Sequence, residues 1–210
     1  MFKDRFDAAQ QLIPYLIRFK NNKDAIVLAI PRGGLQIGSV LAKQLKLPLD
    51  VALTKKIGAP GNEEYAVGAV SLKGEIIDHD AMRSSGASQD YVEKKIKELR
   101  EILKKRYKQY FGKETPPSLK DKIVIITDDG IATGRTMLAT IDFVKREKPK
   151  QIIIAVPVAP PEALEMLKIH VDEVICIDIE PEFFAISEFY ENFEQVEDEE
   201  AIKLLKEANK

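Results

Sequence analysis

The sequence predicts an α/β protein with a parallel β-sheet covered by helices. Short apolar runs rich in β-branched residues, at residues 25–30, 123–126 and 151–156, have the length and composition of strands buried on both faces. A loop containing glycine or proline follows each run, and apolar residues at helical spacing come after the loop. Strands that alternate with helices in this way favour a parallel sheet whose ligands bind at the carboxyl ends of the strands.

The composition narrows the class of protein. At 210 residues the chain is long enough for a sizeable core, and its net charge of −2 gives no basic field that would attract nucleic acid. The single cysteine, Cys176, excludes an intramolecular disulfide and lies in an apolar run, where we expect a buried, inert thiol. The first residues include Lys3, Asp4 and Arg5 rather than the apolar core of a signal peptide, and no apolar run approaches the length of a membrane span. We therefore expect a cytoplasmic protein without a membrane partner.

The elements follow one another in a regular order. Residues 5–19 are expected to form a helix capped by Asp4, with a kink or an early break at Pro14. Strands are expected at residues 25–30, 49–54, 123–126, 151–156 and 171–177, and a small hairpin at residues 64–70 and 75–77. The periodic segment at residues 88–111, in which Ser88 can cap the start and after which Gly112 follows, predicts a long helix.

The most informative stretch is residues 123–136, in which two carboxylates, Asp128 and Asp129, end the buried strand. A loop of glycine and threonine then leads into an amphipathic helix, so that backbone N–H groups and the helix dipole converge on one spot suited to phosphate. The nucleoside-triphosphate P-loop is excluded, because no Gly-Lys-Ser/Thr follows at the required spacing. Two acids beside a phosphate site suit a ligand that also carries hydroxyl groups, such as a sugar phosphate.

This motif resembles the phosphoribosyl-pyrophosphate (PRPP) signature of type I phosphoribosyltransferases. The matching residues are Asp128, Asp129, Gly130, Ile131, Ala132, Thr133, Gly134, Arg135 and Thr136, and Gly130 departs from the usual aliphatic residue. The resemblance implies a Rossmann-like parallel sheet flanked by helices. It also implies that the two acids bind the ribose hydroxyls and that the loop holds the 5′-phosphate. The alternative is an ordinary strand-to-helix turn with an aspartate cap.

Two further loops resemble parts of the same family. Pro31, Arg32, Gly33 and Gly34 are similar to the pyrophosphate loop of bacterial xanthine–guanine phosphoribosyltransferases, where family members often carry a cis non-proline peptide. Lys55 occupies the position of a pyrophosphate-binding arginine in adenine phosphoribosyltransferases. The alternatives are a plain turn for the first loop and a solvated surface charge for Lys55.

The C-terminal part, at about residues 178–210, resembles the hood of six-oxopurine phosphoribosyltransferases. In that comparison Phe183 stacks on the base and Phe184 contributes neighbouring backbone contacts, whereas the alternative is that both are core residues. The resemblance also implies that the hairpin at residues 64–77 is a mobile flap. We predict a single domain over residues 1–210, with the hood and with a helical excursion at about residues 80–115.

The function that the resemblance implies is transfer of 5-phosphoribosyl from PRPP to a nitrogenous base, with a purine favoured. Asp128, Asp129 and Arg32 are the expected catalytic residues, Mg²⁺ the expected cofactor without a protein metal site, and a homodimer the expected assembly. Ala132 matches the adenine enzymes whereas the hood matches the six-oxopurine enzymes, so the base stays open. The alternatives are a PRPP- or nucleotide-sensing regulator and a ribose-phosphate hydrolase on the same fold.

Overall fold

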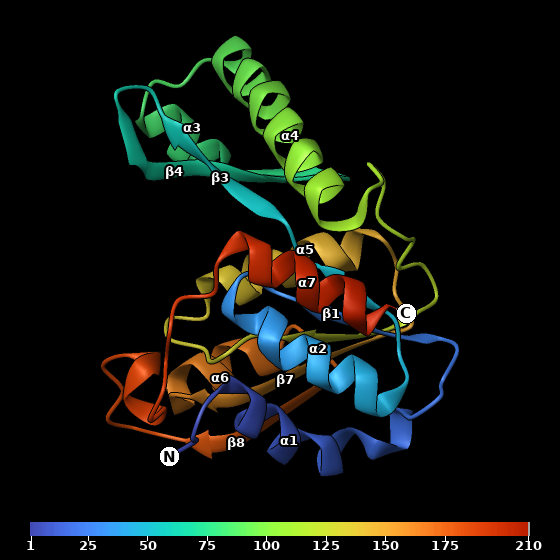
Figure 1. The fold of residues 1–210 in the computed structure, drawn as a ribbon. Helices are drawn as coiled ribbons and strands as arrows, with labels where there is room; N and C mark the ends of the chain where they lie inside the picture. Colours follow the sequence, from blue (N-terminus) through green and yellow to red (C-terminus); the bar gives the residue numbers. More distant parts are fainter. Residues whose placement is uncertain (210) are drawn as a thin grey trace. The chain divides into compact units, whose positions relative to one another are not determined.

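The structure is a computed structural model that describes residues 1–209. The described chain forms two compact units, which Figure 1 shows in sequence colours. The first is built from Met1–Ala52 and from the chain after residue 116, and the second is Leu53–Pro116. The sequence predicts an excursion only from about residue 80, but the second unit begins earlier because it also contains a three-stranded sheet. The single-domain assignment of the whole chain stays a prediction.

A five-stranded parallel sheet forms the centre of the first unit, as predicted. Its strands, in spatial order, are β2 (Leu49–Val51), β1 (Ala25–Ala29), β6 (Ile123–Thr127), β7 (Gln151–Ala159) and β8 (Glu173–Ile179). Every residue of β1 and β6 is buried, as expected for strands that are covered on both faces. The carboxyl ends of these two neighbouring strands lie at the same edge of the sheet, because Ala29 pairs with Thr127.

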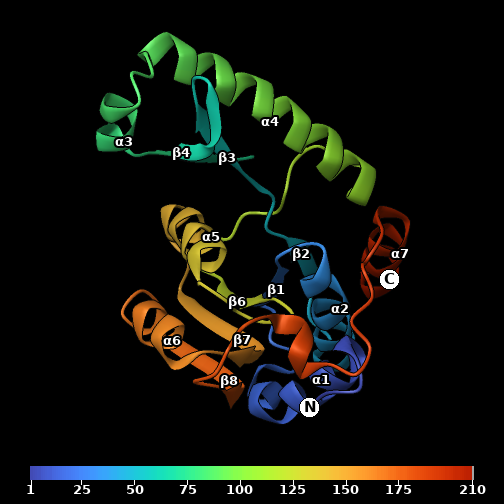
Figure 2. The same ribbon diagram turned by 90° about the vertical axis from the view of Figure 1, so that its left-hand side faces the viewer.

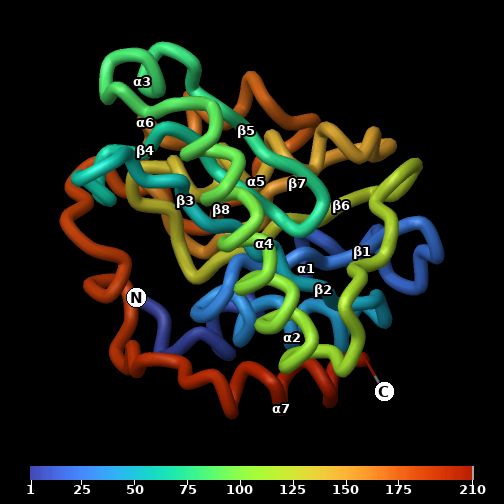
Figure 3. The backbone as a smooth tube through the Cα atoms, turned by 90° about the horizontal axis from the view of Figure 1, so that it is seen from above, coloured from blue at the N-terminus to red at the C-terminus, as the bar shows by residue number. Residues whose placement is uncertain are grey.

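Helices cover both faces of this sheet (Figure 2). α1 (Arg5–Leu16) and α2 (Gly33–Leu45) lie on one face, and α5 (Arg135–Arg146) and α6 (Pro161–Lys168) lie on the other. A fifth helix of this unit, α7 (Asp198–Ala208), packs along α2 (Figure 3). The helix predicted at residues 5–19 breaks early, as expected. Two residues after Pro14 it gives way to the 3₁₀ turn η1 (Ile17–Phe19).

Two strand predictions needed correction. The run at residues 49–54 is not one strand, because β2 ends at Val51 and the next strand begins in the second unit. β7 continues past the predicted end to Ala159 although it contains Pro157. Its pairing with β6 ends at Ala155, so the proline lies where β7 has one neighbouring strand and its missing N–H is tolerated.

The second unit joins a small antiparallel sheet to a long helix. Its strands are β3 (Thr54–Ala59), β4 (Asn62–Ser71) and β5 (Glu75–Ile77), of which β4 and β5 form the predicted hairpin. The short helix α3 (His79–Ser84) leads to α4 (Gln89–Phe111), the long helix expected from the sequence. Ser88 caps α4 at its start, and Gly112 ends it in the left-handed conformation with φ 70°. The role of the hairpin as a flap stays a prediction.

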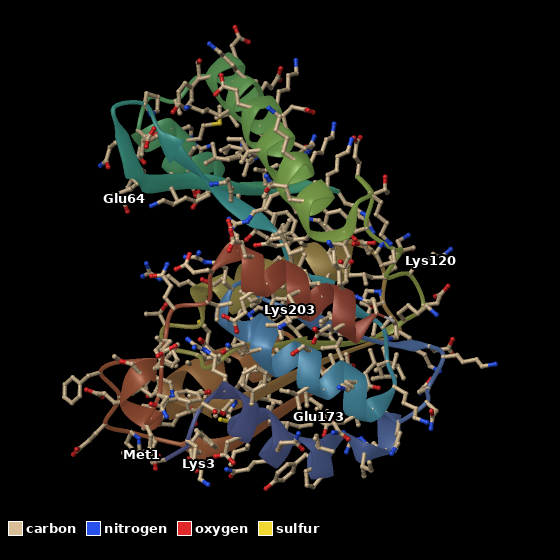
Figure 4. All side chains as sticks on the ribbon, in the orientation of Figure 1. Met1, Lys3, Glu64, Lys120, Glu173 and Lys203 are labelled. Carbon is tan, nitrogen blue, oxygen red and sulfur yellow. The ribbon has the colours of Figure 1, made fainter. Side chains whose placement is uncertain are left out.

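The second unit has its own internal contacts. The Tyr91 hydroxyl donates a hydrogen bond of 3.0 Å to the Gly58 carbonyl, and Arg100 pairs with Glu75. Lys56 of β3 and Glu64 of β4 form an exposed ion pair between the two strands, and Figure 4 labels Glu64. Among residues 1–209, no helix combines the length and the apolar composition needed to cross a membrane.

Candidate functional site

A small hollow of about 150 Å³ lies where β6 leads into α5. Its lining contains every residue of the predicted PRPP signature except Asp129, namely Asp128, Gly130, Ile131, Ala132, Thr133, Gly134, Arg135 and Thr136, together with Met137 and Ile186. Gly134 precedes α5 in the left-handed conformation at φ 73°, which glycine adopts without strain. The backbone N–H groups of the first turn of α5 and the positive end of its dipole therefore border this hollow, which we call the phosphate hollow.

The structure explains why a glycine stands at position 130. A β-carbon there would lie 2.9 Å from Cγ2 of Ile186 and 3.1 Å from Cγ1 of Val158. The following residue, Ile131, donates its N–H to the Val158 carbonyl at 2.9 Å, which fixes the loop against β7. The C-terminal segment thus comes closer to the loop than an aliphatic residue at position 130 would allow.

The turn after β1 packs directly against the two carboxylates. The peptide bond between Pro31 and Arg32 is cis, as the resemblance predicted. A β-carbon on Gly33 would lie 1.9 Å from Oδ2 of Asp129, and one on Gly34 would lie 2.9 Å from Cα and 3.0 Å from Oδ1 of Asp128. Only residues without a side chain allow these two loops to approach so closely, and the structure brings together the two motifs that the sequence places far apart.

The two acids have different surroundings. Asp128 lines the phosphate hollow, whereas Asp129 is only 8% exposed and its Oδ2 accepts a hydrogen bond of 2.8 Å from Nε of Arg5. The backbone carbonyl of Asp129 also accepts a hydrogen bond of 2.6 Å from the Tyr190 hydroxyl. Burial, and then the neighbouring charge of Asp129, raise the pKa of Asp128 well above its ordinary value. Burial and Asp129 likewise raise the pKa of Tyr190, which stays a hydroxyl donor at neutral pH.

Sequence reasoning missed Arg5, and one signal could have found it. The buried residues of α1 are Arg5, Ala8, Ala9, Leu12 and Leu16, a spacing that places the arginine on the apolar face of the helix. A charged residue on such a face needs a partner. The identity of that partner was not predictable, because Asp129 lies 124 positions away in the sequence.

Arg32, the expected diphosphate contact, has acidic neighbours. Its Nη1 lies 3.6 Å from Oε2 of Glu197 and 3.9 Å from Oδ1 of Asp198. Both acids stand at the beginning of α7, whose first turn also contains Glu199 and Glu200. These contacts are long and largely exposed, so they hold the guanidinium weakly.

A second cavity, of about 400 Å³, adjoins the phosphate hollow. Its lining residues, which define what we call the base-side cavity, are Ala132, Thr133, Pro160, Glu162, Ala163, Met166, Phe183 and Phe184. Ala132 and Thr133 line both spaces. Phe183 is stacked on Phe189 with ring centres 4.9 Å apart, and Phe184 is 86% exposed. Phe184 is therefore not a core residue.

Lys55 belongs to β3 of the second unit, where it lines a hollow of about 220 Å³ with Lys56, Gly58, Glu63, Tyr91, Lys95 and Leu99. Among residues 1–209, no group of three or more histidine, cysteine, aspartate or glutamate side chains could hold a metal ion. Cys176 is half-buried, and burial together with the charge of Asp178 raises its pKa to about 12, so it stays a thiol at neutral pH. The raised pKa agrees with the expectation of an inert thiol, whereas the side chain is half-buried and not buried as predicted.

Comparisons with known proteins agree with this geometry. A family model described as a phosphoribosyl transferase domain matches residues 3–194. A Mycobacterium tuberculosis protein provisionally named a phosphoribosyl transferase is 34% identical over 214 residues, which cover 100% of this chain and 47% of that protein. The chain thus spans about half the length of the first curated relatives that it matches.

Two further matches differ in extent. A uracil phosphoribosyltransferase of Mycoplasma genitalium is 40% identical over 65 residues, which are 30% of this chain and 32% of that protein. A crystal structure of a Thermus thermophilus protein is similar with a TM-score of 0.83 and 36% identity, covering 100% of this chain and 99% of that one. The family model covers most of the sequence, and the fold and the paired loops agree with the resemblance. The chain belongs to the phosphoribosyltransferase family.

Proposed function

We propose that this protein transfers the 5-phosphoribosyl group of PRPP to a ring nitrogen of a purine base and releases pyrophosphate. The observation that carries the proposal is the meeting of two loops at the carboxyl ends of β1 and β6. Gly33 and Gly34 pack against Asp129 and Asp128, and Asp128 lines the phosphate hollow. The anion site matches the 5′-phosphate of PRPP, and the carboxylate matches its ribose hydroxyls. The glycine turn with its adjacent arginine matches the diphosphate.

Each part of the donor has a proposed place. The backbone amides of the loop from Ala132 to Thr136 and the first turn of α5 hold the 5′-phosphate. Asp128 and Asp129 serve the ribose hydroxyls. Arg32 and the amides of the glycine turn bind the diphosphate, to which the forked guanidinium donates charge-assisted hydrogen bonds. For Lys55, a point-charge contact with diphosphate stays an expectation that comes from its resemblance to a family position.

The proposed reaction breaks the bond between C1′ of the ribose and the diphosphate oxygen, and the electron pair leaves with the diphosphate. The lone pair of the base nitrogen forms the new bond to C1′, which passes through an oxocarbenium-like state. The proton on that nitrogen is released, and Ala132 offers no side chain to accept it, so it goes to water, to another residue or to the substrate itself. The protein therefore acts by positioning and by stabilising the charge on the leaving group.

Magnesium is proposed to arrive with PRPP rather than to occupy a prepared protein site. The described residues contain no cluster suited to a metal ion, whereas a diphosphate supplies the oxygen ligands that Mg²⁺ prefers. When bound, the ion would neutralise part of the charge that develops on the departing diphosphate.

The base is proposed to occupy the base-side cavity. Phe183, which is stacked on Phe189, and Phe184 both line this cavity, so aromatic side chains are available to a base. Ala132 and Thr133 border both this cavity and the phosphate hollow, which gives a base and a ribose phosphate adjoining places. A large aromatic heterocycle fits this description, and we favour a purine.

We further propose that the protein works as a cytoplasmic homodimer, and that it participates in nucleotide salvage. The exposed side of α4 is the surface proposed for pairing, since Ile102 lies exposed on this 23-residue helix. A single exposed apolar residue does not define an interface, so the support for the dimer is the family resemblance together with the long amphipathic surface that α4 offers.

The decisive experiment measures pyrophosphate release from PRPP with Mg²⁺ across a panel of purine and pyrimidine bases that includes uracil. Release that depends on one base supports the transferase. Release without any base would identify a ribose-phosphate hydrolase instead. Tight binding of PRPP without release under any condition would identify a PRPP- or nucleotide-sensing regulator on the same fold.

A further inference from the structure

Arg5, the first residue of α1, connects three separate parts of the first unit. Its Nε donates to Oδ2 of Asp129 at 2.8 Å, and its Nη1 donates to the Glu194 carbonyl at 2.8 Å. Its guanidinium carbon lies 3.7 Å from the ring centre of Phe193, which is a cation–π contact. The N-terminal helix, the carboxylate after β6 and the C-terminal segment therefore meet at one side chain.

The burial of this ion pair separates it from an ordinary surface contact. The side chain of Arg5 is 6% exposed and that of Asp129 is 12% exposed. By contrast, Arg18 in η1 pairs with Glu173 at the surface, with 51% of the arginine side chain exposed; Figure 4 labels Glu173. A buried charge without its partner costs free energy of folding. Loss of Arg5 should therefore leave Asp129 as a costly buried charge, whereas loss of Arg18 leaves Glu173 in contact with solvent.

The pair also fixes the direction of the carboxylate. Oδ2 of Asp129 is bound by Arg5 and lies so close to Gly33 that a β-carbon there would be 1.9 Å away. The backbone carbonyl of Asp129 is held by Tyr190, and its backbone N–H donates to Oδ1 of Asp128 at 2.8 Å. Asp129 is thus held from several sides, while Asp128 borders the phosphate hollow.

We propose that Arg5 is a positioning residue for the acid pair: it holds Asp129 in a supporting place beside the glycine turn and leaves Asp128 as the carboxylate that meets the ribose hydroxyls. This inference rests on the proposed function and revises it in one respect, because the two acids then have unequal roles. Asp129 acts through its neighbours, and Asp128 touches the ligand.

The electrostatic consequence follows from the groups that face the pair. These are Arg5 from α1, the two carboxylates after β6 and the Tyr190 hydroxyl after η2. The Gln36 side chain of α2 also approaches Arg5, at 3.5 Å, and donates to Glu200 of α7 at 2.6 Å. Asp129 opposes ionisation of Asp128, and the positive charge of Arg5 favours it. Removal of that positive charge should make Asp128 harder to ionise.

The test compares Arg5→Met, Arg5→Lys and the double variant Arg5→Met/Asp129→Asn, with Arg18→Met as the matched control on an exposed ion pair. Binding of ribose 5-phosphate and of PRPP with Mg²⁺ is measured by calorimetry from about pH 5 to pH 8. Circular dichroism and thermal melting establish that each variant is folded. The double variant keeps the test usable if Arg5→Met fails to fold, because it leaves no unpaired buried carboxylate.

We expect Arg5→Met to weaken the binding of both ligands by roughly tenfold or more. We also expect its binding to be lost on acidification at a higher pH than in the wild type. Arg5→Lys should restore the wild-type pH dependence but only part of the affinity, because an ammonium group replaces the charge of the guanidinium and not its forked set of N–H donors. The double variant should bind both ligands with an affinity within a few-fold of wild type, since neither the positive charge nor its buried partner remains. Its binding should be lost on acidification at a pH no higher than in the wild type. Arg18→Met should change nothing.

Two results would overturn the inference. The first is unchanged affinity and pH dependence in a folded Arg5→Met protein. The second is a double variant that binds ribose 5-phosphate as weakly as Arg5→Met alone or more weakly, which would make Asp129 a ligand contact. Binding by wild type without pyrophosphate release would reject the proposed transfer but leave this comparison intact. A wild type that binds neither ligand would reject both.

Discussion

Gly33 lies against Asp129 so closely that a β-carbon on the glycine would be 1.9 Å from the carboxylate oxygen and 3.1 Å from Nε of Arg5. The glycine turn, the second acid and the N-terminal arginine therefore share one tightly packed place. The φ of Gly33 is not positive, so the backbone itself would accept another residue. Space, and not backbone conformation, is what makes position 33 a glycine.

We accordingly expect Gly33→Ala to destabilise the protein by about 1–3 kcal/mol and to weaken PRPP binding, because the added methyl group must displace a buried ion pair. Denaturant unfolding and calorimetry measure the two effects. Gly74→Ala is the matched control, since a β-carbon there meets nothing within 4 Å and φ is not positive. Equal behaviour of the two variants would contradict the close packing.

The beginning of α7 predicts competition for the diphosphate site. Glu197 lies 3.6 Å from Arg32, the proposed diphosphate contact, so a bound diphosphate must replace this neighbour. Glu197→Gln should therefore raise pyrophosphate affinity, by at most about fivefold because the pair is exposed, and the gain should shrink as salt is added. Glu199→Gln removes the same charge from the same turn without a contact to Arg32 and is the control. An equal gain in both variants would indicate a general charge effect instead.

The base-side cavity predicts a difference between two ligands. Phe183→Ala should weaken binding of a purine nucleoside monophosphate by about 0.5–1.5 kcal/mol beyond the lost contact area, while PRPP binding stays nearly intact because PRPP carries no base. Calorimetry with both ligands measures this, and Tyr15→Ala on α1, an exposed aromatic outside the cavity, is the control. Equal losses for both ligands would instead make Phe183 a structural residue that props the hood against Phe189.

The proposed dimer has a direct test. Light scattering at micromolar concentration should give twice the mass of the 210-residue chain, and Ile102→Glu on the exposed side of α4 should reduce it, because a charge would enter an apolar contact. Lys97→Glu makes the net charge more negative by two units, against one unit for Ile102→Glu, and so serves as a stringent control for charge alone on α4. A monomer mass for the wild type would reject the dimer.

Local signals explain how much of the fold could be predicted. Helix α4 was found because its caps, Ser88 and Gly112, and its apolar spacing are all contained in one continuous segment. The parallel sheet followed from buried runs such as β6, whose composition leaves few other arrangements. The division of residues 49–54 between two sheets was not predictable, because no proline, glycine or charge run marks the boundary after Ala52.

The candidate site shows the same limit at the level of single residues. The loop from Asp128 to Thr136 is predictable because the residues that line its hollow are neighbours in the sequence. Arg5 could not be assigned to it, because the contact with Asp129 exists only after α1 has packed beside the sheet. Likewise, Gly130 departs from the family pattern for a reason that lies in the tertiary structure, where a β-carbon on residue 130 would be 2.9 Å from Cγ2 of Ile186.

The different surroundings of the two acids lead to the last prediction, in which two similar substitutions have opposite effects on stability. Asp128 has a higher pKa in the folded protein than in the unfolded chain. At pH values between these two pKa values, the native protein therefore binds more protons than the unfolded chain. Stability from this group therefore falls as pH rises through that interval. Asp128→Asn removes the charge that costs stability, and we expect a higher melting temperature than wild type at pH values above the interval.

Asp129→Asn has the opposite expected effect, because it leaves Arg5 buried without its charged partner and should cost about 3–5 kcal/mol of unfolding free energy. For binding, the order is reversed. Asp128→Asn should weaken PRPP by about 1.5–3 kcal/mol through loss of a charged hydrogen bond, although the protein is more stable. Thermal melting and calorimetry on the two variants give both quantities. A stabilised Asp128→Asn protein that binds PRPP as tightly as wild type would show that this carboxylate does not meet the ligand, and the ribose site would then have to be built from Asp129.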